Sequence, residues 1–164
     1  MRFDPQRYAS PGEVQSARVR RIFDYWRSKA IGGQIPRRTA IDPVELGDVL
    51  SCLLIVEIVN DRFRYRLVGT KVVSNLGVDF TGRYLDELLG PSHTIPWVGF
   101  YRQSFAERRP VMGKVTDPTE SGDTFDYEFG LFPMSHGGTA IRQFIAIEDY
   151  FDFNLKSGAL VGLL

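Results

Sequence analysis

The chain contains few of the residues that bind metals or form disulfides. Among its 164 residues there are one cysteine, Cys52, and two histidines, His93 and His136. A single cysteine excludes an internal disulfide, and these three residues have none of the short spacings that zinc sites use. We therefore expect no metal site.

Charge of one sign and long apolar runs are also missing. The 20 basic and 20 acidic side chains give a formal net charge of zero, whereas a general nucleic-acid binder needs a cationic surface that displaces counterions. No apolar run approaches the roughly 20 residues of a membrane span, and residues 1–10 lack the apolar stretch of a signal peptide. We expect a cytoplasmic protein that binds neither nucleic acid nor a membrane.

Motifs of common enzyme classes are missing too. The chain has no Gly-x-Ser-x-Gly elbow for acyl transfer and no phosphate-binding loop ending in Gly-Lys-Ser or Gly-Lys-Thr. Asp126 and Glu128 share one face of a predicted strand, which suits an acid–base pair and equally an exposed sheet face. We expect no catalytic residue and no enzymatic activity; a small enzyme that uses one of these acids is the alternative.

What the chain does contain is typical of one folded domain. Apolar residues make up 43% and charged residues 24% of the chain, close to globular averages, and this length can enclose one hydrophobic core. Ser10-Pro11-Gly12-Glu13 is a capping box with proline at the first helical position. Apolar residues then recur on one helical face as far as Ala30, before Gly32-Gly33, which predicts a helix over residues 11–31.

The remaining patterns predict an ordered series of helices and strands. Helices are expected at residues 43–49, 70–76, 83–89 and 95–109, and strands at 52–59, 63–69, 111–117, 124–133 and 139–149. This order indicates an α+β fold, a five-stranded antiparallel sheet with its helices on one face. We divide the chain into an N-terminal helical extension (1–34), one domain (35–150) and a C-terminal tail (151–164).

The order of elements resembles that of PAS domains. Residues 63–89, FRYRLVGTKVVSNLGVDFTGRYLDELL, are similar to the passage from the second PAS strand to its short helices. Arg66-Leu67-Val68-Gly69-Thr70 and Gly77-x-Asp79-x-Thr81-Gly82 resemble a bacterial subfamily of stand-alone PAS proteins, in which a helix ending near a tryptophan, here Trp26, precedes the domain. The resemblance covers residues 20–150. It implies a module that binds a small molecule between sheet and long helix, or that dimerises and relays signals without a ligand.

The resemblance does not identify a cofactor. Flavin-type light sensors of this family use a reactive cysteine in an Asn-Cys-Arg-Phe-Leu-like segment, which the chain lacks, and Cys52 begins a predicted strand instead. Haem-binding members use an axial histidine on or just beyond the long helix, and His93 precedes the predicted helix. His136 lies in a Gly-rich turn, where solvation is its simplest role. We name no cofactor.

Aromatic side chains are the first candidates for ligand binding. If the long helix lies across the sheet, Trp97, Tyr101 and Phe105 face Tyr65, Leu67, Phe125, Tyr127 and Phe129. Such a set suits an apolar pocket with a few polar tips, and it equally suits a filled core. Aromatic residues at helical spacing usually fill a core, and the tyrosine hydroxyls keep the pocket as an alternative, because a buried O–H needs a partner.

Arg66 is the second candidate. Arg64 and Arg66 are expected on one strand face, opposite Tyr65 and its aromatic neighbours. The Arg66 guanidinium suits bidentate binding of a ligand carboxylate or phosphate. It also suits a structural ion pair with a loop carboxylate such as Asp79 or Asp86.

The N-terminal helix supplies the candidate interface. Ile22, Phe23 and Trp26 form an apolar stripe on an otherwise basic helix, and such a stripe must be covered. Its own sheet and a second subunit of a symmetric dimer satisfy this requirement equally. The apolar residues 160–164 of the tail are candidates for the same interface.

Together these features predict a PAS-type sensory or regulatory module. Its expected partners are a small-molecule ligand, a second copy of the chain in a homodimer, and a signalling protein. A purely structural dimerisation protein is the remaining alternative to the enzyme named above.

Overall fold

A six-stranded antiparallel sheet forms the middle layer of the molecule, with strand order β1-β4-β5-β6-β2-β3. The computed structural model describes residues 3–88, 90–119 and 121–150. The strands span Asp4–Arg7 (β1), Leu53–Val59 (β2), Arg62–Val68 (β3), Val111–Pro118 (β4), Thr124–Ser135 (β5) and Ile141–Asp149 (β6). The predicted α+β class with an antiparallel sheet is confirmed.

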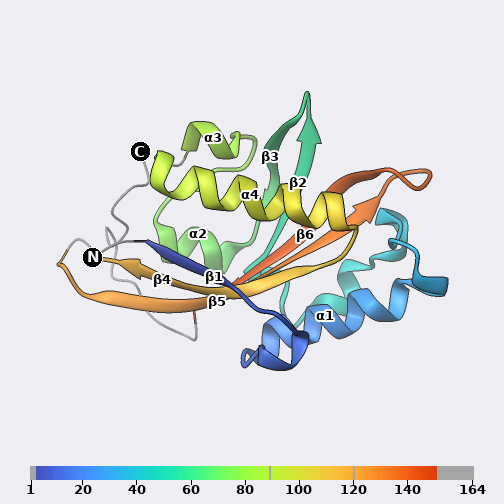
Figure 1. Ribbon diagram of the computed structural model, residues 1–164, viewed down its shortest axis with the longest axis horizontal. Helices are drawn as coiled ribbons and strands as arrows, with labels where there is room; N and C mark the ends of the chain where they lie inside the picture. Colours follow the sequence, from blue (N-terminus) through green and yellow to red (C-terminus); the bar gives the residue numbers. More distant parts are fainter. Residues whose placement is uncertain (1–2, 89, 120, 151–164) are drawn as a thin grey trace.

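Helices cover both faces of this sheet. The α-helices span Ala17–Lys29 (α1), Thr70–Leu76 (α2), Leu85–Leu88 (α3) and Pro91–Glu107 (α4), and short 3-10 helices span Pro11–Glu13, Ile31–Gly33, Arg38–Ala40, Pro43–Leu46 and Leu50–Cys52. Helices α2, α3 and α4 lie on one side of the sheet and α1 lies on the other (Figure 1). The sequence predicted that the helices of the domain share one face and left open what the N-terminal helix covers, and α1 covers the other face.

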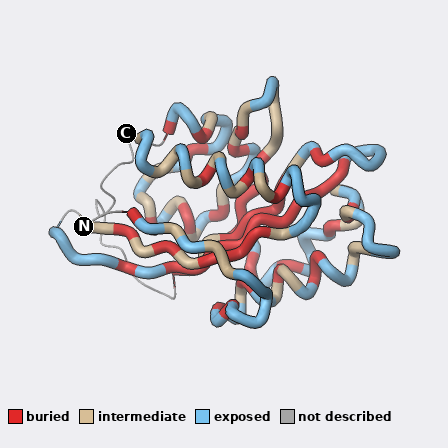
Figure 2. Tube along the Cα trace, viewed as in Figure 1, coloured by how far each residue is buried: buried red, intermediate tan, exposed pale blue. Residues whose placement is uncertain are grey.

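Two hydrophobic cores follow from this layering. Alternate residues of a strand point to opposite faces, so Tyr127 and Phe129 of β5 face α4, whereas Phe132 and Met134 face α1. We call the core under α2–α4 the inner cluster and the core under α1 the outer cluster. The central strands are buried along most of their length (Figure 2), because both of their faces are covered.

Strand β1 corrects the predicted five-stranded sheet. It pairs with β4 at the sheet edge, with Arg7 opposite Gly113. A Cβ on Gly113 would lie 2.1 Å from the carbonyl oxygen of Gln6, so glycine is what allows the two strands to approach. Four residues that include Pro5 form an edge strand with no apolar alternation to detect in the sequence.

The long helix α4 begins at Pro91, earlier than the predicted start at residue 95. Gly90 is its N-cap and Pro91 lies in its first turn, where the missing proline N–H costs no hydrogen bond. The Gly-Pro pair thus starts this helix, although the sequence pattern suggested that it ended the preceding one. As a consequence His93 lies on α4 and not before it.

A β-bulge between β2 and β3 removes Leu67 from the predicted aromatic set. Ile55 pairs with Leu67 while the next residue, Val56, pairs with Tyr65, so Arg66 is the extra residue. A one-residue shift moves a side chain to the other face of the sheet. Leu67 is consequently 47% exposed, while Tyr65 belongs to the inner cluster.

Helix α1 covers its own sheet. Val19 and Ile22 are fully buried in the outer cluster, and the Trp26 indole Nε1 donates a hydrogen bond to the carbonyl oxygen of Pro133 on β5 at 2.8 Å. Of the two arrangements that the apolar stripe allowed, the structure has the intramolecular one. Ile22 and Trp26 are therefore not available to a second subunit, and only Phe23 stays half-buried.

Two expectations are not tested by the described residues. The tail, residues 151–164, lies outside the described residues, so its predicted place in an interface is not addressed. The division at residues 34 and 35 stays a prediction. Within the described residues no helix combines the length and the hydropathy that a membrane-spanning segment requires.

We predict that Ile22→Ala lowers the free energy of unfolding by about 3 kcal/mol, because it leaves a cavity in a packed core. The exposed control Ile95→Ala, on α4, should change it by less than about 0.5 kcal/mol. Urea unfolding at several protein concentrations measures both. An Ile22→Ala effect that depends on protein concentration would instead show that this helix face packs against a second subunit.

Candidate ligand-binding site

Five of the predicted ligand-binding residues meet in the inner cluster. They are Tyr65 of β3, Trp97 and Tyr101 of α4, and Tyr127 and Phe129 of β5. The ring centroids of Trp97 and Phe129 are 4.8 Å apart, in an edge-to-face arrangement. Helix α4 thus lies over the aromatic face of the sheet, as the sequence predicted, and whether these residues bind a ligand stays a prediction.

Phe105 does not join them. The buried residues of α4 are Trp97, Tyr101 and Ser104, at positions i, i+4 and i+7, and Phe105 lies about 80° around the helix from Trp97. Phe105 is accordingly 47% exposed. The expectation that Phe105 faces the sheet was wrong, because the buried face of the helix is narrower than the aromatic spacing suggested.

Arg66 also lies away from the inner cluster. Its Nη1 is 3.6 Å from the Glu57 carboxylate, and its side chain is 62% exposed. Neither expected partner is used, because Asp86 pairs with Arg62 and Asp79 accepts hydrogen bonds from Thr81. Arg66 therefore forms a surface ion pair, one of the two roles predicted for it, although its partner is Glu57. Its role in ligand binding stays a prediction.

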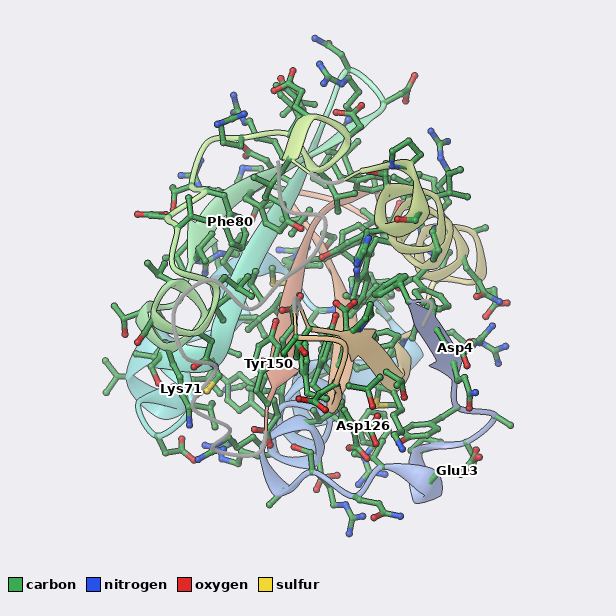
Figure 3. All side chains as sticks on the ribbon, turned by 90° about the vertical axis from the view of Figure 1, so that its left-hand side faces the viewer. Asp4, Glu13, Lys71, Phe80, Asp126 and Tyr150 are labelled. Carbon is green, nitrogen blue, oxygen red and sulfur yellow. The ribbon has the colours of Figure 1, made fainter. Side chains whose placement is uncertain are left out.

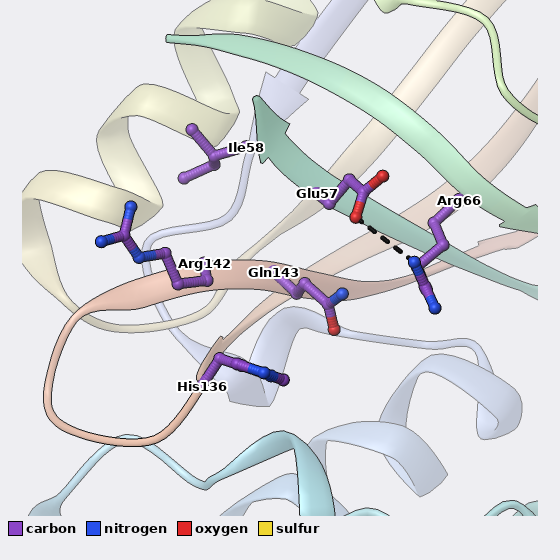
Figure 4. A pocket seen from close by; sticks show the side chains of 6 residues that line it. All are labelled: Glu57, Ile58, Arg66, His136, Arg142 and Gln143. Atoms are coloured by element: carbon purple, nitrogen blue, oxygen red, sulfur yellow. Dashed lines mark ion pairs between the residues drawn. The ribbon is translucent and has the colours of Figure 1, made fainter. Parts of the chain in front are cut away.

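Arg66 lines a separate polar pocket of about 470 Å³ with Glu57, Ile58, His136, Arg142 and Gln143. In Figure 4 the Arg142 guanidinium points away from Arg66, and Glu57 lies beside Arg66. The cationic groups do not converge on one point, and a carboxylate already neutralises one of them. The charged groups of this pocket are therefore not arranged to bind an anion.

The most unusual group in the inner cluster is Glu148, which was not among the candidate residues predicted from the sequence. It stands on β6 between Ala146 and Tyr150, which both face the inner cluster, so the strand alternation points it inward. Burial, with a smaller contribution from the nearby Asp117, raises the pKa of Glu148 to about 7, and a hydrogen bond donated by the Tyr150 hydroxyl opposes this shift. Glu148 as a whole residue is half-buried, so part of it stays accessible.

Three tyrosine hydroxyls accompany this carboxylate. Tyr65, Tyr101 and Tyr127 are all more than nine-tenths buried, and none of their hydroxyls has a hydrogen-bond partner among the described residues. Burial raises the pKa of each, and the Glu148 carboxylate raises it further. The polar ends of residues from β3, α4, β5 and β6 therefore come together around Glu148.

Aromatic rings surround these polar ends. The rings of Tyr127 and Tyr150 are 4.6 Å apart, Phe125 stacks on Tyr127 at 5.8 Å, and Phe80 meets Tyr65 edge-on at 4.6 Å. Figure 3 shows Phe80 on the side of α2 and α3, and Asp126 on the side of α1. The candidate site thus combines aromatic walls with one carboxylate and several hydroxyls.

A further unpaired donor lies on α2. Asn75 is about nine-tenths buried, and its side-chain nitrogen has no hydrogen-bond partner. It occupies the same helical face as Val72, three residues earlier, which belongs to the inner cluster. Asn75 therefore adds an unsatisfied amide to the layer that covers the site.

At one end of the inner cluster His93 and Asp117 form a polar pair. The His93 Nε2 lies 3.2 Å from the Asp117 carboxylate, and its Nδ1 lies 3.0 Å from the Ser92 hydroxyl. Phe3 packs on the imidazole, with ring centroids 4.0 Å apart. Both nitrogens of His93 are thus engaged by protein groups.

The outer face carries a second pair of buried carboxylates, with a structural role. Glu128 accepts hydrogen bonds from the backbone N–H groups of Gln15 and Ser16 at 2.7–3.1 Å and from the Tyr8 hydroxyl at 2.8 Å. Its cross-strand neighbour Asp149 accepts one from the Ser16 hydroxyl at 2.6 Å. Both acids therefore fix the chain that enters α1.

This arrangement weakens the enzyme alternative. Glu128 is buried on the outer face with its oxygens occupied, and Asp126 pairs with Lys114 at 2.9 Å, where both side chains are exposed. Neither acid faces the aromatic interior that was expected to hold a substrate.

The residues present fit poorly with two cofactors of the wider family. Cys52 lies in the outer cluster, on the opposite face of the sheet from the inner cluster, so it cannot react with a flavin held there. His93 already uses both ring nitrogens, which leaves no lone pair for haem iron. No group of three His, Cys, Asp or Glu side chains that could hold a metal ion occurs among the described residues.

Fold and interior together define a small sensor-type α+β domain. The family model of the PAS domain matches residues 14–147, and the chain belongs to this family. A search of curated proteins by sequence gave no match.

Solved structures agree on the fold. An RNA-binding light-oxygen-voltage receptor is similar with a TM-score of 0.51 and 18% identity over 73% of this chain, which spans only 34% of the receptor. A light-oxygen-voltage domain studied with a flavin analogue gives a TM-score of 0.51 and 13% identity over 67% of this chain and 86% of that one. A PAS domain from Colwellia psychrerythraea gives a TM-score of 0.49 and 9% identity over 67% and 98% of the two chains. At such low identities the two matches with a TM-score of 0.51 show a shared fold alone.

We predict that the stability contribution of Glu148 depends on pH. Its pKa is raised from 4.5 to about 7 in the folded protein, so the folded state binds the proton more tightly than the unfolded chain does. The free energy of unfolding should therefore fall as the pH rises between these two values and level off above them. Comparing urea unfolding of the wild type and Glu148→Gln across this range measures the contribution, and identical pH profiles would contradict the prediction.

We predict that Glu128→Gln destabilises the protein by about 2–3 kcal/mol, because it removes a charged acceptor from buried N–H groups. The control Asp126→Asn breaks only an exposed ion pair and should cost about 0–1 kcal/mol. Amide hydrogen exchange at Gln15 and Ser16 should speed up in Glu128→Gln alone. Equal costs for the two variants would show that Glu128 does not anchor α1.

Proposed function

We propose that the chain is a PAS-type sensory module that binds a small molecule in the inner cluster, around Glu148. The observation that carries this proposal is that three buried tyrosines, Tyr65, Tyr101 and Tyr127, bring hydroxyls with no hydrogen-bond partner among the described residues into the surroundings of the Glu148 carboxylate. Hydroxyls without a protein partner beside one carboxylate suit a site where a ligand or water completes the hydrogen bonds.

The strands under the site offer a route for the signal. Tyr127 and Glu128 are neighbours on β5, and Glu148 and Asp149 are neighbours on β6, so each pair has one member in the site and one at the anchor of α1. A ligand that favours one packing of the inner cluster acts by its difference in affinity for the two packings. We propose that this difference reaches α1 and, through it, a partner protein.

A homodimer remains part of the proposal, through a different surface from the one expected. Ile22 and Trp26 are buried within the chain, whereas Ile31 and Val44, at the turns that follow α1, are 82% and 86% exposed. We propose these two side chains as contacts of the homodimer.

The two tryptophans allow a direct test, because Trp97 lies in the inner cluster and Trp26 in the outer one. Native mass spectrometry of the protein purified from cells should show a retained small molecule. Adding that molecule to protein from which it has been removed should shift the NMR signal of the Trp97 indole N–H and leave that of Trp26 in place. The same mass spectra report the number of subunits.

Matched variants locate the binding site. Tyr127→Phe removes one unpaired hydroxyl and should weaken binding by roughly 10-fold, in line with about 1.4 kcal/mol for one hydrogen bond. Tyr84→Phe, at the surface beside Arg62, should leave affinity unchanged. A protein that retains no molecule, and whose Trp97 signal responds to no added compound, would contradict the proposed function.

A further inference from the structure

Two carboxylates and one histidine lie at the inner cluster. The buried or half-buried carboxylates of Glu148 and Asp117 lie there, and Asp117 is the charged neighbour that acts on Glu148. His93 is paired with Asp117 at 3.2 Å. No lysine or arginine is buried among the described residues, so no fixed cation compensates Glu148.

The basic residues of α1 form ion pairs away from the inner cluster. Arg18 pairs with Asp149 at 2.9 Å, Arg21 with Asp48 at 3.5 Å, and Lys29 with Glu45 at 2.9 Å. All three pairs lie on the α1 side of the sheet. The groups that act on Glu148 are the Tyr150 hydroxyl and the Asp117 carboxylate, so an anionic ligand beside Glu148 would meet negative charge.

The walls of the site suit the opposite charge. A cation is attracted to the faces of aromatic rings, and this attraction strengthens when water is excluded. Tyr127 and Tyr150 place two such rings 4.6 Å apart, centroid to centroid, and the Tyr150 hydroxyl donates a hydrogen bond to Glu148. The unpaired tyrosine oxygens can accept hydrogen bonds from an ammonium group, and the Glu148 carboxylate can form an ion pair with it.

From the aromatic walls, the unpaired hydroxyls and the uncompensated carboxylate of Glu148, we infer that the ligand is an organic cation, an amine with an apolar or aromatic body. This inference rests on the proposed function and adds the charge of the ligand. Flat anions and phosphate esters are excluded by the same arrangement, because they would place negative charge beside Glu148 and Asp117.

Three probes that share one carbon skeleton test the charge. Benzylamine, benzyl alcohol and benzoate are titrated into the full chain at about pH 8, where Glu148 is ionised because its pKa is about 7, and the Trp97 indole N–H signal is followed by NMR with Trp26 as the internal control. Benzylamine should bind at least about 10-fold more tightly than the other two, which is the effect of one charge-assisted contact. Its affinity should fall by about 10-fold at about pH 6, where one carboxylate in ten remains ionised.

Variants assign the preference to Glu148. Glu148→Gln should abolish the preference for benzylamine over benzyl alcohol and its pH dependence, while Asp126→Asn, on the outer face, should leave both unchanged. Circular dichroism and the Trp26 signal check that each variant is folded. If Glu148→Gln does not fold, Glu148→Asp takes its place. This variant keeps the charge and should keep the preference for benzylamine.

The outcomes separate this inference from the proposed function. Benzyl alcohol or benzoate shifting the Trp97 signal as readily as benzylamine would overturn the inference and leave the ligand site standing. Benzylamine bound equally well by wild type and Glu148→Gln would also overturn it. A Trp97 signal that none of the probes shifts, in a protein that also retains no molecule from cells, would overturn both.

Discussion

The alternation of side chains along β5 and β6 is the constraint on which the rest of the molecule depends. Because both faces of these strands are covered, each residue belongs to one of two interiors. Tyr127 and Glu148 reach the inner cluster, and their chain neighbours Glu128 and Asp149 hold the start of α1. Neighbouring residues in a strand cannot move independently, so a change of packing on one face is felt on the other.

The carboxylates on the two faces differ in how far they are satisfied. Glu128 accepts hydrogen bonds from two backbone N–H groups and one hydroxyl, so its burial is compensated and its role is structural. Glu148 has the Tyr150 hydroxyl as its partner, and burial raises its pKa to about 7. Proteins tolerate an incompletely satisfied charge mainly where it serves a function, which is why the inner face, and not the outer, is the candidate site.

Local sequence patterns were sufficient to predict most helices and strands. They were insufficient where pairing with a strand distant in the sequence determines the structure. The capped segment at residues 70–76 forms α2 with the predicted bounds, and Gly77 ends it with φ +77°, because both signals lie within the segment. Strand β1 and the bulge at Arg66 depend on partner strands that are distant in the sequence. Glu148 could have been found, because alternation from Phe144 and Ala146 places it on an apolar face. The tyrosine hydroxyls around Glu148 could not have been found from the sequence, because the groups that meet there come from four different elements.

The raised pKa of Glu148 and the proposed cationic ligand describe one equilibrium. A proton and an ammonium group both neutralise the same buried carboxylate, so each lowers the affinity for the other by the same factor. The proton is half bound at about pH 7, and the carboxylate is therefore poised where a ligand of modest affinity can displace it. Because the competing states differ by one buried charge, they need not differ much in shape. The hydrogen bond from Tyr150 and the packing of Tyr127 on β5 are then the contacts most directly altered, and both lie one residue from the anchors of α1.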